Sequence, residues 1–165
     1  MARLHRINLK GPWNYEWLDG PHRRNTSSPG EDDSEFSEVL LNHSRVRMPS
    51  SIEDAWGAVT GTVRFRRRFQ RPTNLDPHER VHIAFDGLGG SARVLLNEKQ
   101  IAELRDVEST RSVDVTEQIC PTNTLTVDLH WNPDESAQSA GGLWGAVAIE
   151  IHASPNAASQ PTERQ

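Results

Sequence analysis

The chain has 165 residues, which is enough for one domain of ordinary size. Its net charge of −5 disfavours a nucleic-acid-binding surface, which is normally basic, and no run approaches the ~20 apolar residues that a membrane helix needs. The single cysteine, Cys120, excludes an internal disulfide. The N-terminus carries positive charge with no apolar run behind it, so we recognise no signal peptide and expect a cytoplasmic location.

Apolar and polar side chains alternate in short runs along the chain, which is the pattern of half-buried strands. In chain order the predicted strands cover residues 4–9, 13–18, 62–69, 80–85, 92–96, 101–104, 113–115, 125–131 and 147–151. We expect a turn near Asn97 and Glu98, and one helical turn around Ser51 to Trp56, capped by Ser51. Short strands separated by turns indicate an all-β sandwich.

The apolar faces of these strands predict the core. Trp13 and Trp17 are four residues apart on one strand face and are expected in the core as well. The strand at 62–69 places Arg64, Arg66 and Arg68 on its other face. We interpret them as a solvent face paired with carboxylates of neighbouring strands, with attraction of an acidic sugar or acidic partner as the alternative. The predicted core residues are Val63, Phe65, Phe69, Val81, Ile83, Phe85, Val94, Leu96, Leu125, Val127, Leu129, Val147 and Ile149.

Two segments differ from the rest in composition. Residues 20–38 contain proline, glycine, serine and a run of acidic residues with one large apolar side chain, Phe36, and are predicted to form a mobile loop. Residues 154–165 have the same character and are predicted to be a disordered tail. We therefore expect one β-sandwich domain over residues 1–153.

Seven segments, in chain order, resemble patterns of family 2 glycoside hydrolases. Residues 9–15 resemble L-x-G-x-W-x-F/Y, residues 61–69 resemble W-Y-R-R-x-F, residues 81–87 resemble V-x-L-x-F-x-G and residues 92–97 resemble A-x-V-x-V/L-N-G. Residues 113–116 are similar to D-V-T, residues 123–127 to N-x-L-x-V and residues 141–147 to G-G-I-W/Y-R-x-V. Each pattern is weak alone, and the order of all seven is what makes the resemblance specific.

This resemblance implies a jelly-roll β-sandwich of the galactose-binding-like type, which in that family precedes an immunoglobulin-like domain and the catalytic barrel. The chain ends where the family's sandwich ends, so we expect the barrel and its catalytic glutamates to be missing. Two positions depart from the family pattern. Glu98 replaces the glycine after the hairpin asparagine, which disfavours a type I′ turn, and Gly145 replaces an arginine.

The loop from His130 to Glu135 is the leading candidate for ligand binding. A sugar needs an aromatic plane for its apolar face and amide or carboxylate groups for its hydroxyls, and this loop supplies both at one end of the sandwich. The candidate ligand-binding residues are Trp56, Trp131, Asn132, Asp134 and Glu135. Alternation with Leu129 favours a second interpretation, in which Trp131 belongs to the core and the loop is a solvated turn.

Catalysis is not expected. Glycosidases need two carboxyl groups about 5 Å or roughly 6.5–9.5 Å apart, and no pair in this sequence has the pattern of one buried acid and one exposed base. His82 and His130 are both predicted on outward faces, and no histidine has zinc-ligand spacing. A calcium ion supporting a loop is the remaining option, but no acidic loop has a recognisable ligand order. We expect no cofactor.

Two functions from different classes remain, with an autonomous hydrolase as the least favoured third. The first is a non-catalytic carbohydrate-binding module resembling the sugar-binding domain of β-galactosidases and β-glucuronidases. The second is a protein-interaction domain that docks on a separate glycosidase barrel or another partner. A groove lined by aromatic rings and carboxylates would favour the first, and a flat apolar patch would favour the second.

Overall fold

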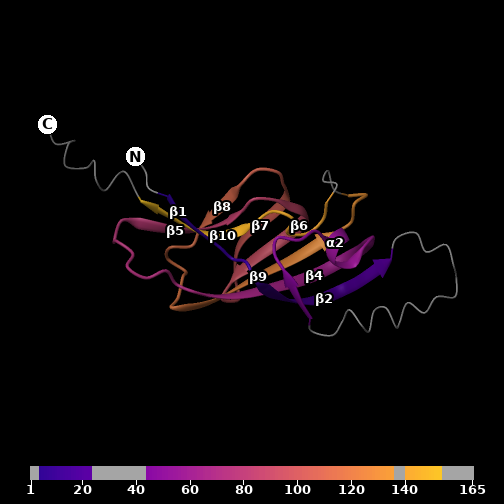
Figure 1. Cartoon of the computed structure of the whole chain (residues 1–165), viewed down its shortest axis with the longest axis horizontal. Coiled ribbons are helices and arrows are strands. Elements are labelled where there is room, and N and C mark those ends of the chain that lie inside the picture. Colours follow the sequence, from indigo (N-terminus) through magenta and orange to yellow (C-terminus); the bar gives the residue numbers. More distant parts are fainter. Residues whose placement is uncertain (1–3, 24–43, 136–139, 154–165) are drawn as a thin grey trace.

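The computed structural model describes residues 4–23, 44–135 and 140–153. Within these ranges the chain forms ten strands and one short helix, and the strands make two antiparallel sheets (Figure 1). The elements are β1 (Leu4–Asn8), β2 (Pro12–Arg23), β3 (Ser44–Arg47), α2 (Ile52–Trp56), β4 (Val59–Gln70), β5 (Glu79–Phe85), β6 (Leu88–Leu96), β7 (Lys99–Val107), β8 (Arg111–Asp114), β9 (Thr122–Trp131) and β10 (Val147–Ala153).

The two sheets enclose one hydrophobic core. The four-stranded sheet has the order β1-β10-β5-β8, and the six-stranded sheet has the order β3-β2-β4-β9-β6-β7. This arrangement confirms the predicted all-β sandwich. Among the described residues, no helix has the length and apolar character to cross a membrane.

The core contains the residues that alternation predicted. All thirteen predicted core side chains are buried, with exposed fractions between 0% and 8%. Trp13 and Trp17 are buried as well, and the indole N–H of Trp13 donates to the carbonyl of Leu9 at 2.9 Å. The apolar faces of the strands that carry these residues therefore point inward, as the period of two requires. Strand β1 is an exception, because its apolar residues Leu4 and Ile7 are exposed.

The structure adds one strand and changes several boundaries, and strands β4, β6, β7 and β9 all begin earlier than predicted. Strand β3 was not predicted because Val46 is its only large apolar residue, and its place in the sheet comes from pairing with β2, where Val46 lies opposite Trp13. Strand β2 continues to Arg23, past the expected start of the mobile loop near residue 20. The remainder of that predicted loop, residues 24–38, and the predicted tail at 154–165 lie outside the described residues.

The expected helical turn is present as α2. The side-chain oxygen of Ser51 accepts a hydrogen bond from the backbone N–H of Asp54 at 3.1 Å, so Ser51 is the N-cap that the sequence predicted. Its glutamate, Glu53, accepts the backbone N–H of Gly141 at 3.1 Å and so ties the helix to the segment that precedes β10.

The hairpin between β6 and β7 keeps a tight two-residue turn despite Glu98. Asn97 and Glu98 have φ angles of 52° and 71°, the left-handed conformation at both turn positions that a type I′ turn needs. The side chain of Asn97 is held by the neighbouring strand β9, because its Oδ1 accepts from the N–H of Thr124 at 2.9 Å and its Nδ2 donates to Asn123 at 3.0 Å. These bonds fix the turn although glycine is missing.

A row of charged and histidine side chains crosses the outer face of the four-stranded sheet in strand order. Arg6 donates to Glu150 at 3.2 Å, and Glu150 lies 3.1 Å from the ring of His152. The ring of His152 packs against that of His82 with centroids 4.3 Å apart, and His82 lies 3.8 Å from Asp114. Pairing of β5 with β10 and β8 creates this row.

The position of His82 makes its charged form unfavourable. Burial lowers the pKa of His82 below its ordinary value of 6.5, the nearby charge of His152 lowers it further, and the attraction of Asp114 and Glu150 does not offset these effects. The unfolded chain therefore binds this proton at a higher pH than the folded chain does. Stability from this group is present above about pH 6.5 and is lost as the pH falls toward the folded pKa.

We predict that Glu98→Gly stabilises the domain by about 0.5–1 kcal/mol, because glycine adopts a positive φ without the penalty that a side chain brings. The measurement is urea unfolding of the parent and the variant. Gln100→Gly is the matched control on the adjacent strand β7, where loss of a side chain should cost about 0.5–1 kcal/mol. A loss of stability in Glu98→Gly would contradict the argument from the turn.

We predict that His82→Phe reduces the loss of stability between about pH 7 and pH 5, because the variant has no proton to take up at this position. Thermal unfolding at a series of pH values measures the effect. His78→Phe, which changes an exposed histidine in the loop before β5, is the matched control. If the stability of both variants changes with pH as that of the parent does, burial of His82 does not control stability in this pH range.

Candidate functional site

The segments of the predicted ligand site lie at one end of the six-stranded sheet. Strand β9 ends at Trp131, and its neighbour β4 begins at Val59, with Gly61 opposite Trp131 in the ladder. Because α2 directly precedes β4 and the loop at 132–135 directly follows β9, both segments lie at this end (Figure 1). The structure therefore brings Trp56 and the loop to the same end of the sandwich, as expected.

Trp131 lies in the core and not on the surface. Its side chain is 1% exposed, and one face of the indole is covered by Gly141, where an added Cβ atom would collide with the ring. A fully buried ring has no face to offer to a sugar. The second interpretation of this residue, packing with Leu129, is the one that the structure supports.

Trp56 is half-buried in a cluster of aromatic rings. Its centroid lies 4.8 Å from that of Tyr15 and 5.1 Å from that of Trp17, both in edge-to-face contact, and 6.1 Å from that of Phe65. These contacts are of the kind that stabilise a core. Most of the indole is therefore used in packing, and only its outer part is available to a ligand.

The loop at 132–135 folds tightly onto the ends of the neighbouring strands. The side-chain oxygen of Asn132 accepts from the N–H of Asp134 at 3.0 Å, and its carbonyl accepts from the N–H of Glu135 at 2.9 Å. The carboxylate of Glu135 lies 3.3 Å from the ring of His130, and its carbonyl accepts from Arg105 at 3.3 Å. The loop is thus held between β9 and β7.

Asn132 and Glu135 line a small crevice together with His130, Arg105 and residues at the start of β6. Its volume of about 10 Å³ is enough for one water molecule and not for a sugar. Asp134 lies outside the crevice on the exposed side of the turn. Of the five predicted residues, Asn132 and Glu135 therefore share a hollow, whereas Trp131 does not contribute to it.

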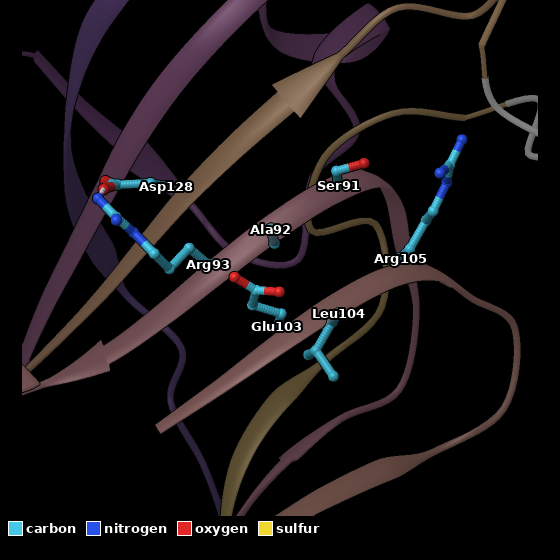
Figure 2. Close-up of a pocket in the computed structure, with 7 residues that line it drawn as sticks. All are labelled: Ser91, Ala92, Arg93, Glu103, Leu104, Arg105 and Asp128. Atoms are coloured by element: carbon cyan, nitrogen blue, oxygen red, sulfur yellow. Dashed lines mark hydrogen bonds and ion pairs between the residues drawn. The ribbon is translucent and has the colours of Figure 1, made fainter. Parts of the chain in front are cut away.

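A larger groove begins beside this crevice on the outer face of the six-stranded sheet. It has a volume of about 540 Å³ and shares Ser91 and Arg105 with the crevice. Figure 2 shows Arg93 and Asp128 together, Ser91 and Arg105 away from them, and Glu103 between the two groups. The side chains come from three neighbouring strands, β6, β7 and β9.

Asp128 is the most buried charged group of this face, with 8% of its surface exposed. Burial disfavours its ionised form, but hydrogen bonds from Arg64 at 2.6 and 2.9 Å, the charge of Arg64 and a weaker bond from Arg93 at 3.5 Å lower its pKa below the usual range. The same pairing raises the pKa of Arg64. The expected pairing of the arginine row with neighbouring carboxylates is confirmed here and at Arg66, which lies 3.8 Å from Glu16.

The described residues do not bring two buried carboxylates together. Asp128 lies on β9 of the six-stranded sheet and Glu150 on β10 of the other sheet, and each is bound by arginine. The same separation applies to His130 and His82, which lie on different sheets. Within these ranges no cluster of three histidine, cysteine or acidic side chains has a geometry suited to a metal ion.

The groove of Figure 2 was not predicted from the sequence. Arg93 and Arg105 alternate with buried residues and so were recognisable as outward-facing positions. Their position along one groove with Asp128, however, requires β6 to lie between β9 and β7, an order that alternation does not specify. The sequence therefore indicated that each side chain faces outward, but it did not indicate that these side chains lie together.

The fold resembles solved β-glucuronidase structures. The Bacteroides uniformis enzyme has a TM-score of 0.65 and 19% identity, covering 90% of this chain and 18% of that chain. The Bifidobacterium dentium enzyme, complexed with coumarin-3-O-glucuronide, has a TM-score of 0.64 and 18% identity over 92% of this chain and 30% of that chain. The Faecalibacterium prausnitzii enzyme has a TM-score of 0.63 and 17% identity over 91% of this chain and 32% of that chain.

The chain thus spans less than a third of the length of these three enzymes, and at such identities the likeness shows a shared fold. No curated protein matches the sequence. Fold and sequence together define a galactose-binding-like β-sandwich. Residues 34–157 match the sequence profile described as glycosyl hydrolase 2 galactose-binding domain-like, and the chain belongs to that family.

We predict that Trp131→Ala destabilises the domain by about 3–5 kcal/mol, because it leaves a large cavity in the core. Trp56→Ala is the matched comparison and should cost less, about 1–2 kcal/mol, since part of that ring is already exposed. Urea unfolding of both variants measures the difference. A smaller loss in Trp131→Ala than in Trp56→Ala would contradict the assignment of Trp131 to the core.

Proposed function

We propose that this domain binds a carbohydrate and does not hydrolyse it. The observation that carries the proposal is the groove of about 540 Å³ on the six-stranded sheet, whose volume lies within the range of roughly 300–1,000 Å³ typical of ligand sites. Its lining combines the hydroxyl of Ser91 with guanidinium groups of Arg93 and Arg105 and the carboxylate of Glu103. Membership of a family described as galactose-binding domain-like supports a sugar as the ligand.

The chemistry of the groove suits sugar hydroxyls, although no aromatic ring of the described residues lines it, contrary to the expectation from the sequence. A hydroxyl group both donates and accepts hydrogen bonds, so it pairs with carboxylates on one side and guanidinium groups on the other. These groups project from paired strands, which hold their positions better than a loop does. Because the groove is open to solvent, much of the ligand stays hydrated, and a weak affinity is expected.

The carboxylates support binding without hydrolysis. A glycosidase needs a protonated acid with a raised pKa beside a second carboxylate. On the groove, bonds to Arg64 and Arg93 outweigh the effect of burial and lower the pKa of Asp128, so this group stays ionised and is a poor proton donor. Such a carboxylate is an acceptor for hydroxyl groups and a partner for arginine.

Docking on a separate glycosidase barrel or another protein is the alternative function. A docking surface normally has a contiguous apolar patch. The large apolar side chains exposed in the described part of the chain are Leu4, Ile7 and Leu18, with the first two on β1 and the third on β2 of the other sheet. Since they lie on different sheets, they give this alternative less support than the groove gives to a sugar.

Isothermal titration calorimetry of the purified chain with a panel of neutral and acidic oligosaccharides tests the proposal. We expect saturable binding to at least one sugar and no product from aryl glycosides. Absence of binding to every member of the panel at millimolar concentration would refute the carbohydrate function. Turnover that is abolished by a single Asp or Glu substitution would refute the non-catalytic part.

The double variant Asp134→Ala with Glu135→Ala tests whether the loop of the predicted site takes part. If the sugar reaches the crevice beside the groove, the double variant should bind it more weakly, because Glu135 lines that crevice. Both side chains are exposed, so the melting temperature should be kept. Unchanged affinity with an unchanged melting temperature would place the site away from this loop.

A further inference from the structure

We propose that the outer face of the six-stranded sheet binds an acidic polysaccharide, laid across the strands with its uronate carboxylates paired to arginines. This inference rests on the carbohydrate-binding function above and names the ligand class and the binding face. It concerns the whole face from β3 to β7 and not only the groove beside the loop.

The first argument is the charge of this face. Its outward strand positions carry seven arginines and four carboxylates, an excess of three positive charges on a chain whose net charge is −5. The carboxylate of Glu98 lines the face at the β6–β7 hairpin and leaves the excess positive. The arginines are Arg45, Arg47, Arg64, Arg66, Arg68, Arg93 and Arg105, and the carboxylates are Glu16, Asp19, Glu103 and Asp128.

The second argument is the shape of the face. Two further hollows lie on it, one of about 550 Å³ over β4, β9 and β6 and one of about 280 Å³ over β2, β3 and β4, and both are lined by Arg64 and Arg66. Asp128, which Arg64 and Arg93 both contact, connects them with the groove of Figure 2. With strands about 4.8 Å apart, the six strands span roughly 24 Å, a length suited to an extended chain of several sugars.

The third argument is that the arginines are already positioned for carboxylates. Arg64 binds Asp128 through two parallel bonds of 2.6 and 2.9 Å, which shows on this face the fork geometry that arginine uses with carboxylates. Arg93 lies 3.5 Å from Asp128, with about half of its side chain exposed, and Arg66 lies 3.8 Å from Glu16 with a similar exposure. These longer contacts leave both guanidinium groups able to bind a ligand.

The groups between the arginines favour a sugar over other acidic polymers. Asn14, Thr124 and Thr126 line the two hollows and offer hydrogen bonds to hydroxyls, which a uronate sugar carries beside its carboxylate on every unit. Tyr15 is the aromatic residue of the lining and is 7% exposed, so it offers little surface for base stacking or for an interface anchor. A chain of uronate sugars, which offers both carboxylates and hydroxyls, matches this mixed lining better.

The experiment uses calorimetry with oligogalacturonate as the acidic probe and a neutral galactan oligosaccharide of equal length. The test variant is Arg66→Gln with Arg93→Gln, and the matched control is Arg71→Gln with Arg111→Gln, which removes the same charge from exposed positions away from this face. We expect oligogalacturonate to bind the parent more tightly than galactan does. We expect the test variant to lose about tenfold in affinity, with the control staying within about twofold.

Conservative variants keep the test decisive if the double glutamine variant is unstable. Arg66→Lys with Arg93→Lys retains the charges but removes the fork, and its affinity should fall between those of the parent and the glutamine variant. Affinity equal to that of the parent in the lysine variant would refute the fork geometry. Equal losses in the test variant and the control would refute this face as the site.

Other ligands separate failure of this inference from failure of the proposed function. If the chain binds galactan as tightly as oligogalacturonate, the acidic ligand class is refuted and the carbohydrate function stands. If no glycan binds, both are refuted. Tighter binding of polyglutamate, single-stranded DNA or dextran sulfate than of oligogalacturonate would refute the uronate ligand in favour of those polymers.

Discussion

The pairing of β4 with β9 is the constraint on which the rest of this structure depends. The ladder runs from Gly61 opposite Trp131 to Gln70 opposite Thr122 at the centre of the six-stranded sheet. It places Val63 opposite Leu129 on the inner face and Arg64 opposite Asp128 on the outer face. A slip by one residue would turn apolar side chains to water and charged ones into the core, so burial of one face fixes the register.

This register also shapes the outer surface. Strands β2 and β6 each pair with one of the two central strands, so their outward residues are aligned by the same ladder. The alignment brings Arg93 of β6 beside Asp128 and Glu16 of β2 beside Arg66. The proposed ligand face is therefore a consequence of the core. The same register that buries the inward side chains also aligns the outward side chains of neighbouring strands.

Alternation predicted the core well because the order of apolar and polar residues within a strand indicates which of its faces is buried. Leu129 and Phe65 were assigned correctly on that basis, and the same pattern placed Trp131 inside when its chemistry suggested a ligand role. Strand β3 could not be predicted, since Val46 alone gives no pattern and β2 supplies the pairing. This strand forms because a neighbouring strand lies beside it, and the sequence of the segment itself does not indicate that neighbour.

The assemblies between strands were beyond prediction for a related reason. His82 meets His152 because β5 lies beside β10, and the groove forms because β6 lies between β9 and β7. Each residue could be assigned to an outward face, but the order of strands depends on how the whole core packs. Family resemblance supplied the type of sandwich and did not supply these contacts.

The packing of Gly141 against Trp131 has a consequence for how this domain varies among its relatives. The glycine has no room for a side chain, its N–H is bound by Glu53 and its carbonyl accepts from Ile52, so the backbone cannot retreat from the ring. A larger residue at 141 is accommodated only when the residue at 131 becomes smaller. Related sequences should therefore show covariation of these two positions in volume, with small residues at one accompanying large residues at the other.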